Sequence, residues 1–325
     1  APGNPPGGPW MKSAILRHYK FDPRTLLGAS GRDCLVVDAR PRKEFLRGHI
    51  PGAVHIPWEE WNEKAPNEVR PILRQPGYWG KLASPDSFDF SHRLQNLGLD
   101  RDTPVVVYAD GQKSVGREGR IAWMLLYLGA KNVSILDGGL KAWKGQKLPL
   151  EREVSTKPST SFQIELAPQR RMLHEDLVDS IGTDSFPTMI DTRTVREHTG
   201  QVFWYQPKKG CIPESKLLVY KSIFQKDGFS FVDQETYKSL LPDNYESLKN
   251  IAGYCEVGVR VCTVALLHEH YTGQVMPVYD GSIMEWSFDD KLPVLTADQI
   301  NEINEVETSG KYPKPDPTDT GRIEY

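Results

Sequence analysis

Short apolar runs alternate along this chain with stretches of helical periodicity. Residues 35–38, 105–109 and 133–136 are continuous runs rich in Val, Ile and Leu, which is typical of strands buried on both faces. Residues 117–128 show helical spacing of apolar positions, and Gly129 ends that pattern. Strands that alternate with helices predict an α/β fold in which helices flank both faces of a parallel sheet.

The same patterns occur twice, at a spacing of about 150 residues. Each copy starts with a buried strand ending in Asp-x-Arg, at 36–40 and again at 189–193. Further paired motifs keep the same order, with Gly48-His-Ile-Pro matching Gly210-Cys-Ile-Pro, Asp137-Gly-Gly matching Asp280-Gly-Ser, and Trp143 matching Trp286. We therefore expect two tandem copies of one α/β domain.

The boundaries of these domains follow from composition. A stretch with mixed charges, Ser/Thr residues and a proline separates the two copies, and the end of the chain is polar and proline-rich. We expect a flexible N-terminal arm at residues 1–11, a first domain at 12–149, a linker at 150–167, a second domain at 168–294, and a C-terminal helix with an extended tail at 295–325.

Composition excludes several classes of protein. With 325 residues, 38% hydrophobic and 26% charged, the chain is typical of a globular protein of about two domains. Its net charge of −3 does not favour binding to nucleic acid or to a membrane surface. No apolar run is long enough to cross a bilayer, and we expect no secretory signal in the first residues. Monomers or weak dimers are expected.

Cysteine usage indicates a reducing compartment. The four cysteines, Cys34, Cys211, Cys255 and Cys262, are too few for a disulfide framework and form no C-x-x-C pair. We expect Cys262 to be a core residue two turns along a helix. The cytoplasm is the expected location, with the mitochondrion as the alternative.

Cys255 is the strongest candidate for chemistry. It follows the apolar run 250–254 and precedes a helical pattern that starts at Val261. A cysteine at a strand-to-helix turn faces backbone N–H groups and the positive end of a helix dipole, which stabilise an anionic sulfur. A lone cysteine at the end of a strand is, however, more often an inert core residue.

The surrounding motifs resemble the rhodanese family. The segment 37–57, with its Asp-Ala-Arg and Gly-His-Ile-Pro-Gly-Ala-Val-His-Ile-Pro motifs, is similar to the start of a rhodanese domain, and the segments 137–143 and 280–286 are similar to its end. The resemblance covers residues 12–290 and implies a tandem-domain sulfurtransferase of the thiosulfate/3-mercaptopyruvate type. It places the active loop at Cys255-Glu256-Val257-Gly258-Val259-Arg260.

The resemblance also implies a mechanism. Cys255 would attack a small anionic sulfur donor, become a persulfide, and pass the outer sulfur to cyanide or to a thiol acceptor such as thioredoxin or a low-molecular-weight thiol. The N–H groups of residues 256–260 would hold the sulfur. Asp110 stands near the nucleophile's position in the first copy and cannot carry sulfur, so that domain is expected to form one wall of the cleft.

No cofactor or metal is expected for this chemistry. The segment His268-Glu269-His270 lacks the spacing of a zinc-binding helix. We therefore predict that it is a solvated helix end.

The active loop departs from the family pattern. Thiosulfate-preferring members carry basic residues after the cysteine, and mercaptopyruvate-preferring members carry Gly and then Ser or Thr, whereas this chain has Glu256 and Val257. Because a carboxylate beside the sulfur repels a dianion, 3-mercaptopyruvate is favoured over thiosulfate as donor. The family's donor-binding arginine is displaced by one position, to Arg196.

Several basic residues are candidates for donor binding: Arg193, Arg196, Lys208, Lys209 and His49. Arg260 has two interpretations, either lining an anion pocket or forming a structural salt bridge with Asp191 or Asp280.

Two other functions stay open at this stage. The spacing Cys-x4-Arg is one residue shorter than the Cys-x5-Arg loop of rhodanese-like phosphatases, so a phosphatase ranks low. A catalytically silent rhodanese-type binding or regulatory protein is the second alternative, because Glu256 and the missing hydroxyl at Val257 depart from the active pattern.

Overall fold

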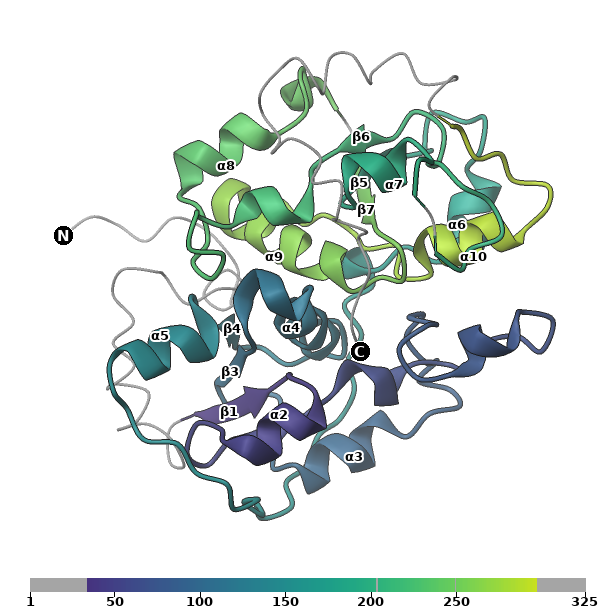
Figure 1. Ribbon diagram of the computed structural model, residues 1–325. Coiled ribbons are helices and arrows are strands. Elements are labelled where there is room, and N and C mark those ends of the chain that lie inside the picture. Colours follow the sequence, from purple (N-terminus) through teal and green to yellow (C-terminus); the bar gives the residue numbers. More distant parts are fainter. Residues whose placement is uncertain (1–33, 203, 249, 297–325) are drawn as a thin grey trace.

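The computed structural model describes residues 34–202, 204–248 and 250–296, and it has two similar α/β halves. Figure 1 shows residues 34–149, here called the first half, in purple to teal, and residues 168–296, the second half, in teal, green and yellow. The predicted N-terminal arm at residues 1–11, residues 12–33 of the predicted first domain, and the predicted C-terminal helix and tail beyond residue 296 lie outside the described residues. The predicted α/β fold with parallel sheets flanked by helices is confirmed.

In the first half, a four-stranded parallel sheet has the order β2-β1-β3-β4. Its elements are β1 (Leu35–Asp38), α2 (Arg42–Arg47), β2 (Val54–His55), η2 (Trp58–Trp61), η3 (Pro71–Arg74), α3 (Phe90–Asn96), β3 (Val105–Tyr108), η4 (Gly111–Ser114), α4 (Arg117–Tyr127), β4 (Val133–Ile135) and α5 (Gly139–Gly145).

In the second half, a three-stranded parallel sheet has the corresponding order β6-β5-β7, and an isolated parallel bridge from Gly253 to Val278 extends it. Its elements are η5 (Pro168–Arg170), α6 (His174–Asp179), β5 (Thr188–Asp191), α7 (Val195–His198), β6 (Lys216–Leu217), η6 (Tyr220–Ile223), α8 (Gln234–Leu240), η7 (Tyr245–Ser247), β7 (Ile251–Tyr254), α9 (Arg260–Thr272) and α10 (Ser282–Phe288).

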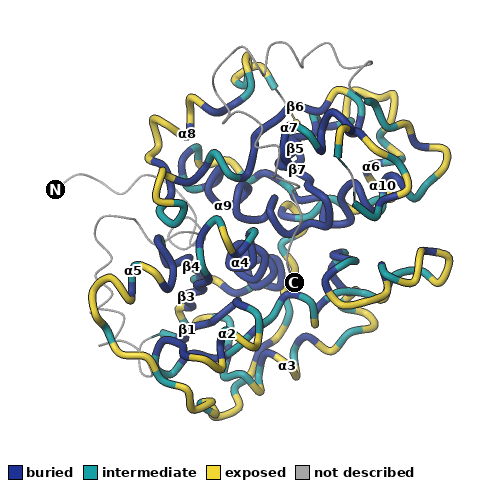
Figure 2. Tube along the Cα trace, viewed as in Figure 1, coloured by how far each residue is buried: buried dark blue, intermediate teal, exposed yellow. Residues whose placement is uncertain are grey.

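The two halves share one hydrophobic core that runs through α4 and α9. Figure 2 shows both helices as buried where the halves meet. Gly119 on α4 lies so close to Thr263 on α9 that a β-carbon on the glycine would lie 2.5 Å from the Cα of Thr263. The absence of a side chain therefore brings the two helix backbones into direct contact and fixes the position of the start of α9.

Contacts between the halves are duplicated in the same way as the sequence. The carboxylate of Asp280 in the second half accepts the N–H of Leu82 in the first half at 2.7 Å. Asp137, the matching residue of the first half, accepts the N–H of Phe231 at 2.8 Å. Each half thus extends a segment over the loop region of the other, which positions both walls of the site described below.

Two expectations about α9 are wrong. The helix starts at Arg260, so Cys262 lies in its first turn and not two turns along it. His268 and Glu269 are buried and not solvated. His268 lies between the hydroxyls of Tyr237 and Tyr245, and Glu269 forms a two-bond ion pair with Arg170. The polar side chains of this segment are therefore bonded to partners inside the fold and do not face solvent.

Across the ranges that the structure describes, no helix combines the length and apolarity needed to cross a bilayer.

Candidate active site

Cys255 lies between the end of β7 and the start of α9, as the strand-to-helix pattern predicted. Its backbone is fixed to α10, because its N–H donates to Ser282 Oγ at 3.1 Å and its carbonyl accepts from the N–H of Ile283 at 3.2 Å. The whole residue is buried, with no exposed surface. The thiol is therefore held in a defined, water-poor position, and a donor can reach it only when neighbouring side chains move.

The backbone of Ser282 is strained, and the side chain of the same residue holds Cys255. Its φ is +56°, in the left-handed region that favours glycine, and the matching residue of the first half is Gly139 with φ +51°. Ser282 Oγ donates to the carbonyl of Tyr279 and accepts from Cys255. A non-glycine residue in this conformation costs on the order of 1 kcal/mol or more, and such strain is often found at functional sites.

Replacing Ser282 by Gly should distinguish the energetic cost of the backbone strain from the contribution of the hydrogen bond. The variant relieves the strain and loses the hydrogen bond, so we expect its free energy of unfolding to change by less than about 1 kcal/mol. Turnover should fall about tenfold because the nucleophile loses its anchor. Ser282→Ala is the matched control: it keeps the strain and loses the bond, and it should lose both stability and turnover. Steady-state kinetics and urea unfolding test this, and unchanged turnover in both variants contradicts the anchoring role.

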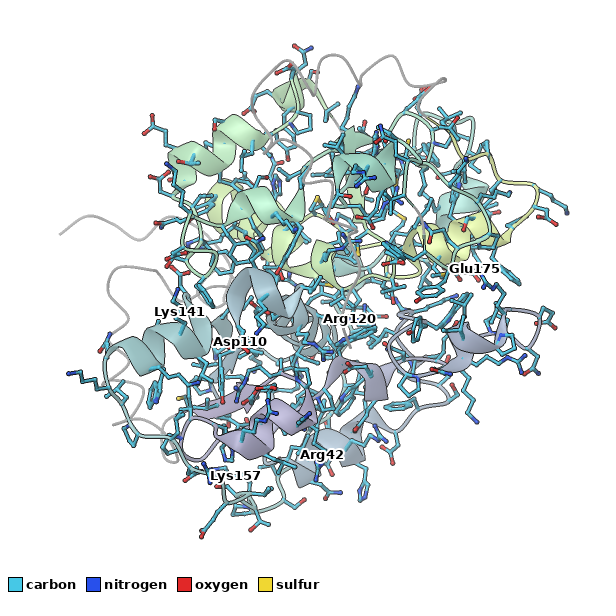
Figure 3. The ribbon with its side chains drawn as sticks, viewed as in Figure 1. Arg42, Asp110, Arg120, Lys141, Lys157 and Glu175 are labelled. Atoms are coloured by element: carbon cyan, nitrogen blue, oxygen red, sulfur yellow. The ribbon has the colours of Figure 1, made fainter. Side chains whose placement is uncertain are left out.

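The active loop, residues 255–260, is shaped by close contacts with backbone on both sides. Gly258 has φ +77°, and a β-carbon there would lie 2.3 Å from the carbonyl oxygen of Asp280. From the first half, Gly80 approaches the carbonyl of Val257 so closely that no side chain fits. Arg120 on α4 donates to the carbonyl of Gly258 at 3.0 Å. These contacts fix the shape of the loop, and Arg120, labelled in Figure 3, holds it from the first half.

Four backbone donors of the loop have no acceptor. Within the described part of the chain, the N–H groups of residues 256–259 form no hydrogen bond, although all four residues are buried. Buried N–H groups without a partner are rare in folded proteins, and each costs about 1–3 kcal/mol. Successive N–H groups next to a thiol and a helix N-terminus form a site for an anion.

Arg260 ends the loop and is paired with Glu197 on α7. Its Nη1 and Nη2 donate to the two carboxylate oxygens of Glu197 at 2.9 and 2.7 Å. Burial opposes the charge of Arg260, but Glu197 above all, with smaller contributions from Cys255 and Glu256, raises its pKa. Arg260 does form a salt bridge, but the expected partners, Asp191 and Asp280, are wrong. Asp191 is paired with Arg193, and Asp280 is paired with Arg171.

Glu256 is a second carboxylate beside the same guanidinium. Its Oε2 lies 3.9 Å from Arg260 Nη2, and the residue is 4% exposed. Burial, together with the negative charge of Glu197, raises the pKa of Glu256 to about 7, while Arg260 and Arg193 oppose the rise. Two carboxylates around one arginine leave one negative charge without compensation near the sulfur whenever both are ionised.

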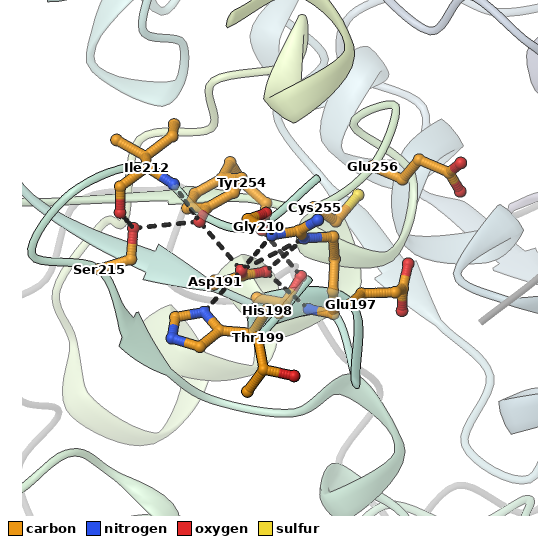
Figure 4. Close-up of polar contacts among 12 residues, drawn as sticks. Asp191, Glu197, His198, Thr199, Gly210, Ile212, Ser215, Tyr254, Cys255 and Glu256 are labelled. Carbon is orange, nitrogen blue, oxygen red and sulfur yellow. Dashed lines mark hydrogen bonds and ion pairs between the residues drawn. The ribbon is translucent and has the colours of Figure 1, made fainter. Parts of the chain in front are cut away.

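A buried network centred on Asp191 supports the loop (Figure 4). Asp191 accepts hydrogen bonds from Arg193 Nε and Nη2, His198 Nδ1 and the hydroxyl of Tyr254, the residue before Cys255. Burial opposes ionisation of Asp191, but Arg193 and His198 outweigh it and hold the pKa of this carboxyl far below its usual value. In the first half, Asp38 is bonded in the same way to Arg40 and Tyr108.

A cavity of 740 Å³ lies between the halves, and Arg260 forms part of its wall. Its charged lining is mostly basic: Arg40, Lys43, Lys113, Arg117, Arg193, Lys221 and Arg260 against Glu44 and Asp110. The four arginines are ion-paired with carboxylates outside the lining, so the excess of positive charge is smaller than this count suggests. The cavity still favours a small anion, and the first half, including Asp110, supplies one wall as expected.

The structure places the other predicted binding residues differently. His49 is wholly buried, stacks on Phe45 and bonds to backbone carbonyls, so it does not face the cleft. Lys208 donates to the carbonyls of Asp289 and Leu292, away from the cavity. Lys209 is exposed, Arg196 is half-buried, and neither lines the cavity. Arg193 does line it, but its guanidinium is bound to Asp191 and to the carbonyl of Gly210.

Sequence reasoning missed Glu197, Ser282 and Arg120. Glu197 could have been found, because Thr194 and Glu197 form the capping box that starts α7 and its spacing is visible in the sequence. Ser282 stands where the first copy has the second glycine of Asp-Gly-Gly, which is a signal only when the copies are compared. Nothing in the sequence indicated that Arg120 reaches across to the other half.

Among the described residues, no cluster of three or more His, Cys, Asp or Glu side chains is arranged to hold a metal ion.

Known proteins are similar to this chain over most of its length. A family model described as Rhodanese-like domain matches residues 23–146. A Pseudomonas aeruginosa protein named Probable 3-mercaptopyruvate sulfurtransferase is 30% identical over 281 residues, which is 82% of this chain and 93% of the relative. Mouse 3-mercaptopyruvate sulfurtransferase is 26% identical, covering 85% of this chain and 89% of its own, and bovine thiosulfate sulfurtransferase is 26% identical, covering 75% and 79%.

Solved structures show the same fold. The crystal structure of YnjE matches with a TM-score of 0.69 at 23% identity over 86% of this chain, and the wild-type structure of EanB with 0.66 at 19%. This chain spans about two thirds of the length of these two proteins, 68% and 65%. The chain belongs to the rhodanese family. Within it, the protein is a sulfurtransferase enzyme.

Proposed function

We propose that this enzyme takes sulfane sulfur from 3-mercaptopyruvate, holds it as a persulfide on Cys255, and passes it to a thiol acceptor. The observation that carries the proposal is the set of four buried, unpaired N–H groups at residues 256–259 directly after the cysteine. A thiolate or a persulfide anion would accept these groups and remove the cost of leaving them unpaired. The helix dipole of α9 adds to the stabilisation.

The donor preference rests on charge. Thiosulfate brings two negative charges to the sulfur and mercaptopyruvate brings one. Glu197 is bound to Arg260, and the pKa of Glu256 is raised to about 7, so Glu256 is partly ionised near pH 7 and in that form acts against a second donor charge at short range. The carboxylate of 3-mercaptopyruvate can bind on the basic side of the cavity, where Arg260 and Lys113 lie.

The acceptor is proposed to be a low-molecular-weight thiol or the exposed thiol of thioredoxin. The cavity volume of 740 Å³ lies within the range of small-molecule sites and exceeds what a three-carbon donor fills. The covalent intermediate separates the two half-reactions, so ping-pong kinetics are expected.

Donor competition tests the proposal. At pH 7 we expect kcat/KM for 3-mercaptopyruvate to exceed that for thiosulfate at least about tenfold, which corresponds to about 1.4 kcal/mol. Initial rates with each donor and one common acceptor, cyanide, give the ratio. A higher value for thiosulfate contradicts the donor assignment, and turnover with neither donor contradicts both halves of the proposal.

A further inference from the structure

The active site has two buried carboxylates and one guanidinium, and only one of the carboxylates is fully bonded. Glu197 Oε2 accepts from Arg260 Nη1, from the N–H of Thr194 at 3.0 Å and from Thr194 Oγ1 at 2.8 Å, while Oε1 accepts from Arg260 Nη2. Both carboxylate oxygens of Glu197 are therefore occupied, and both bind Arg260.

Glu256 is in the opposite situation. Within the described part of the chain, no hydrogen bond is made to its carboxylate, and its one ionic contact is the 3.9 Å approach to Arg260. It is as buried as Arg260 itself. A carboxylate that is buried without donors is more stable with a proton. The proton of this cluster therefore resides on Glu256.

The backbone of Glu256 is also held directly after that of Cys255. Its carbonyl accepts the N–H of Met284 at 3.1 Å, one residue beyond the α10 N–H that holds the carbonyl of Cys255. Two consecutive residues fixed on the same helix end cannot move independently. Figure 4 shows the Glu256 side chain directed away from the Asp191 network, so it is not part of that structural cluster.

We propose that Glu256 is the proton donor and acceptor of the transfer reaction, which rests on the proposed donor, 3-mercaptopyruvate. In the donor step the Cys255 thiolate attacks the donor sulfur, an S–S bond forms and the donor's C–S bond breaks. The electron pair of that C–S bond remains on the carbon, which takes the proton of Glu256, so pyruvate leaves with its methyl group and Glu256 becomes ionised. The Cys255 sulfur is oxidised to the persulfide and the donor carbon is reduced.

The acceptor step restores the proton. The acceptor thiol gives its proton to ionised Glu256 while its sulfur attacks the outer sulfur of the persulfide. An S–S bond forms to the acceptor, the bond to Cys255 breaks, and the thiolate and protonated Glu256 are regenerated. Thiosulfate as donor needs no such proton, because its leaving group, sulfite, departs as an anion. Loading of Cys255 from 3-mercaptopyruvate should therefore depend on Glu256, and loading from thiosulfate should not.

Other charges around Glu256 do not change this assignment. Arg193 and Glu197 act on it from the β5–α7 region and Arg260 from its own loop. From α4, Arg120 is bonded to the carbonyl of Gly258, and before α10, Asp280 is paired with Arg171. Because its pKa is raised to about 7, Glu256 can both give and take a proton near neutral pH.

Single-turnover persulfide formation in Glu256→Gln tests the proposal. Intact-mass quench measurements at pH 7 should show loading from 3-mercaptopyruvate slowed about 10²-fold, the usual contribution of a general acid, and loading from thiosulfate unchanged or faster. In the wild type, loading from 3-mercaptopyruvate should fall about tenfold per pH unit above about pH 7 as Glu256 loses its proton, and the Gln variant should lack this fall. Glu246→Gln, at an exposed position, is the control and should behave as the wild type.

Each outcome decides between the proposals. Equal slowing with both donors would mean that Glu256 only positions the loop, and no slowing would remove it from the reaction; either overturns the inference. If the wild type loads from neither donor, the proposed donor fails and not the role of Glu256. Should Glu256→Gln not fold, as judged by circular dichroism, Glu256→Asp keeps the acid. It should load slowly with the pH-dependent fall retained, and loss of the fall overturns the inference.

Discussion

Replacing Cys255 by Ser is expected to lower turnover at least about 10⁴-fold with every donor, because a serine cannot carry sulfane sulfur. The side chain is wholly buried and its backbone is fixed by Ser282 and Ile283, so the fold should tolerate the change. We expect a loss of no more than about 2 kcal/mol in the free energy of unfolding, the cost of a buried hydroxyl. Pyruvate release from 3-mercaptopyruvate measures the activity, and urea unfolding measures the stability.

Cys34→Ser is the matched control for that experiment. Cys34 lies beside β1 in the first half, is partly exposed, and does not line the cavity. Its variant should keep wild-type turnover. Residual activity above background in Cys255→Ser, or an equal loss in Cys34→Ser, contradicts the assignment of the nucleophile.

Asp191→Asn is expected to cost about 3–5 kcal/mol of unfolding free energy at pH 7, since it leaves the buried guanidinium of Arg193 without its counter-charge. The same change replaces one of the two acceptor oxygens by a donor NH2 group, so the bonds from Arg193, His198 and Tyr254, the residue that precedes Cys255, cannot all be kept. Chemical denaturation at pH 7 gives the difference.

The pKa of Asp191 is depressed in the folded state, so its stabilisation is present above the unfolded pKa of about 3.9 and declines at lower pH. The difference in unfolding free energy between the wild type and Asp191→Asn should therefore become smaller as the pH falls.

Two further variants define this effect. Asp38→Asn removes the corresponding carboxylate of the first half and should cost a similar amount, because Arg40 is buried in the same way. Asp102→Asn removes an exposed ion pair with Lys131 and should change stability by less than about 1 kcal/mol. If Asp191→Asn costs no more than Asp102→Asn, the Asp191 network is not what holds this half together.

The sequence predicted the fold because its strongest signals are local. The buried strands at 35–38 and 105–108 are continuous apolar runs, and α4 shows clear helical spacing. The Asp-x-Arg and Gly-x-Ile-Pro motifs recur because they are two ends of one network. In each half the arginine binds the aspartate and also the carbonyl of the glycine, at Gly48 and at Gly210. The repeat therefore predicted the architecture that these contacts produce.

The candidate residues for donor binding could not be assigned from the sequence in the same way. Lys208 and His49 are polar in sequence, but their partners are backbone carbonyls that only the tertiary fold brings near. Arg260 was recognised, yet its partner Glu197 is 63 residues away, and no local pattern indicates such a pair. The loop itself could be identified because its residues are contiguous in sequence. The charges around it could not be identified, since they come from elements that are far apart in sequence.

Electrostatics at the loop differ from the pattern expected of the family. Arg260 is one of the four arginines that line the cavity and Arg196 is not, and a carboxylate follows the cysteine directly. Both changes lie within one buried cluster, with Glu197 holding the arginine in place. The loop that departs from the pattern is thus internally balanced, which favours an active enzyme with its own donor preference over a loop that has lost its function.

The persulfide on Cys255 is the central claim, and intact-mass spectrometry tests it most directly. Purified protein incubated with 3-mercaptopyruvate, and separately with thiosulfate, should gain about 32 Da, one sulfur atom, and peptide mapping should place it on Cys255. The gain should disappear on addition of a thiol acceptor and should not form in Cys255→Ser. A protein that gains no mass with either donor, or that carries the sulfur on Cys34, Cys211 or Cys262, would contradict the account.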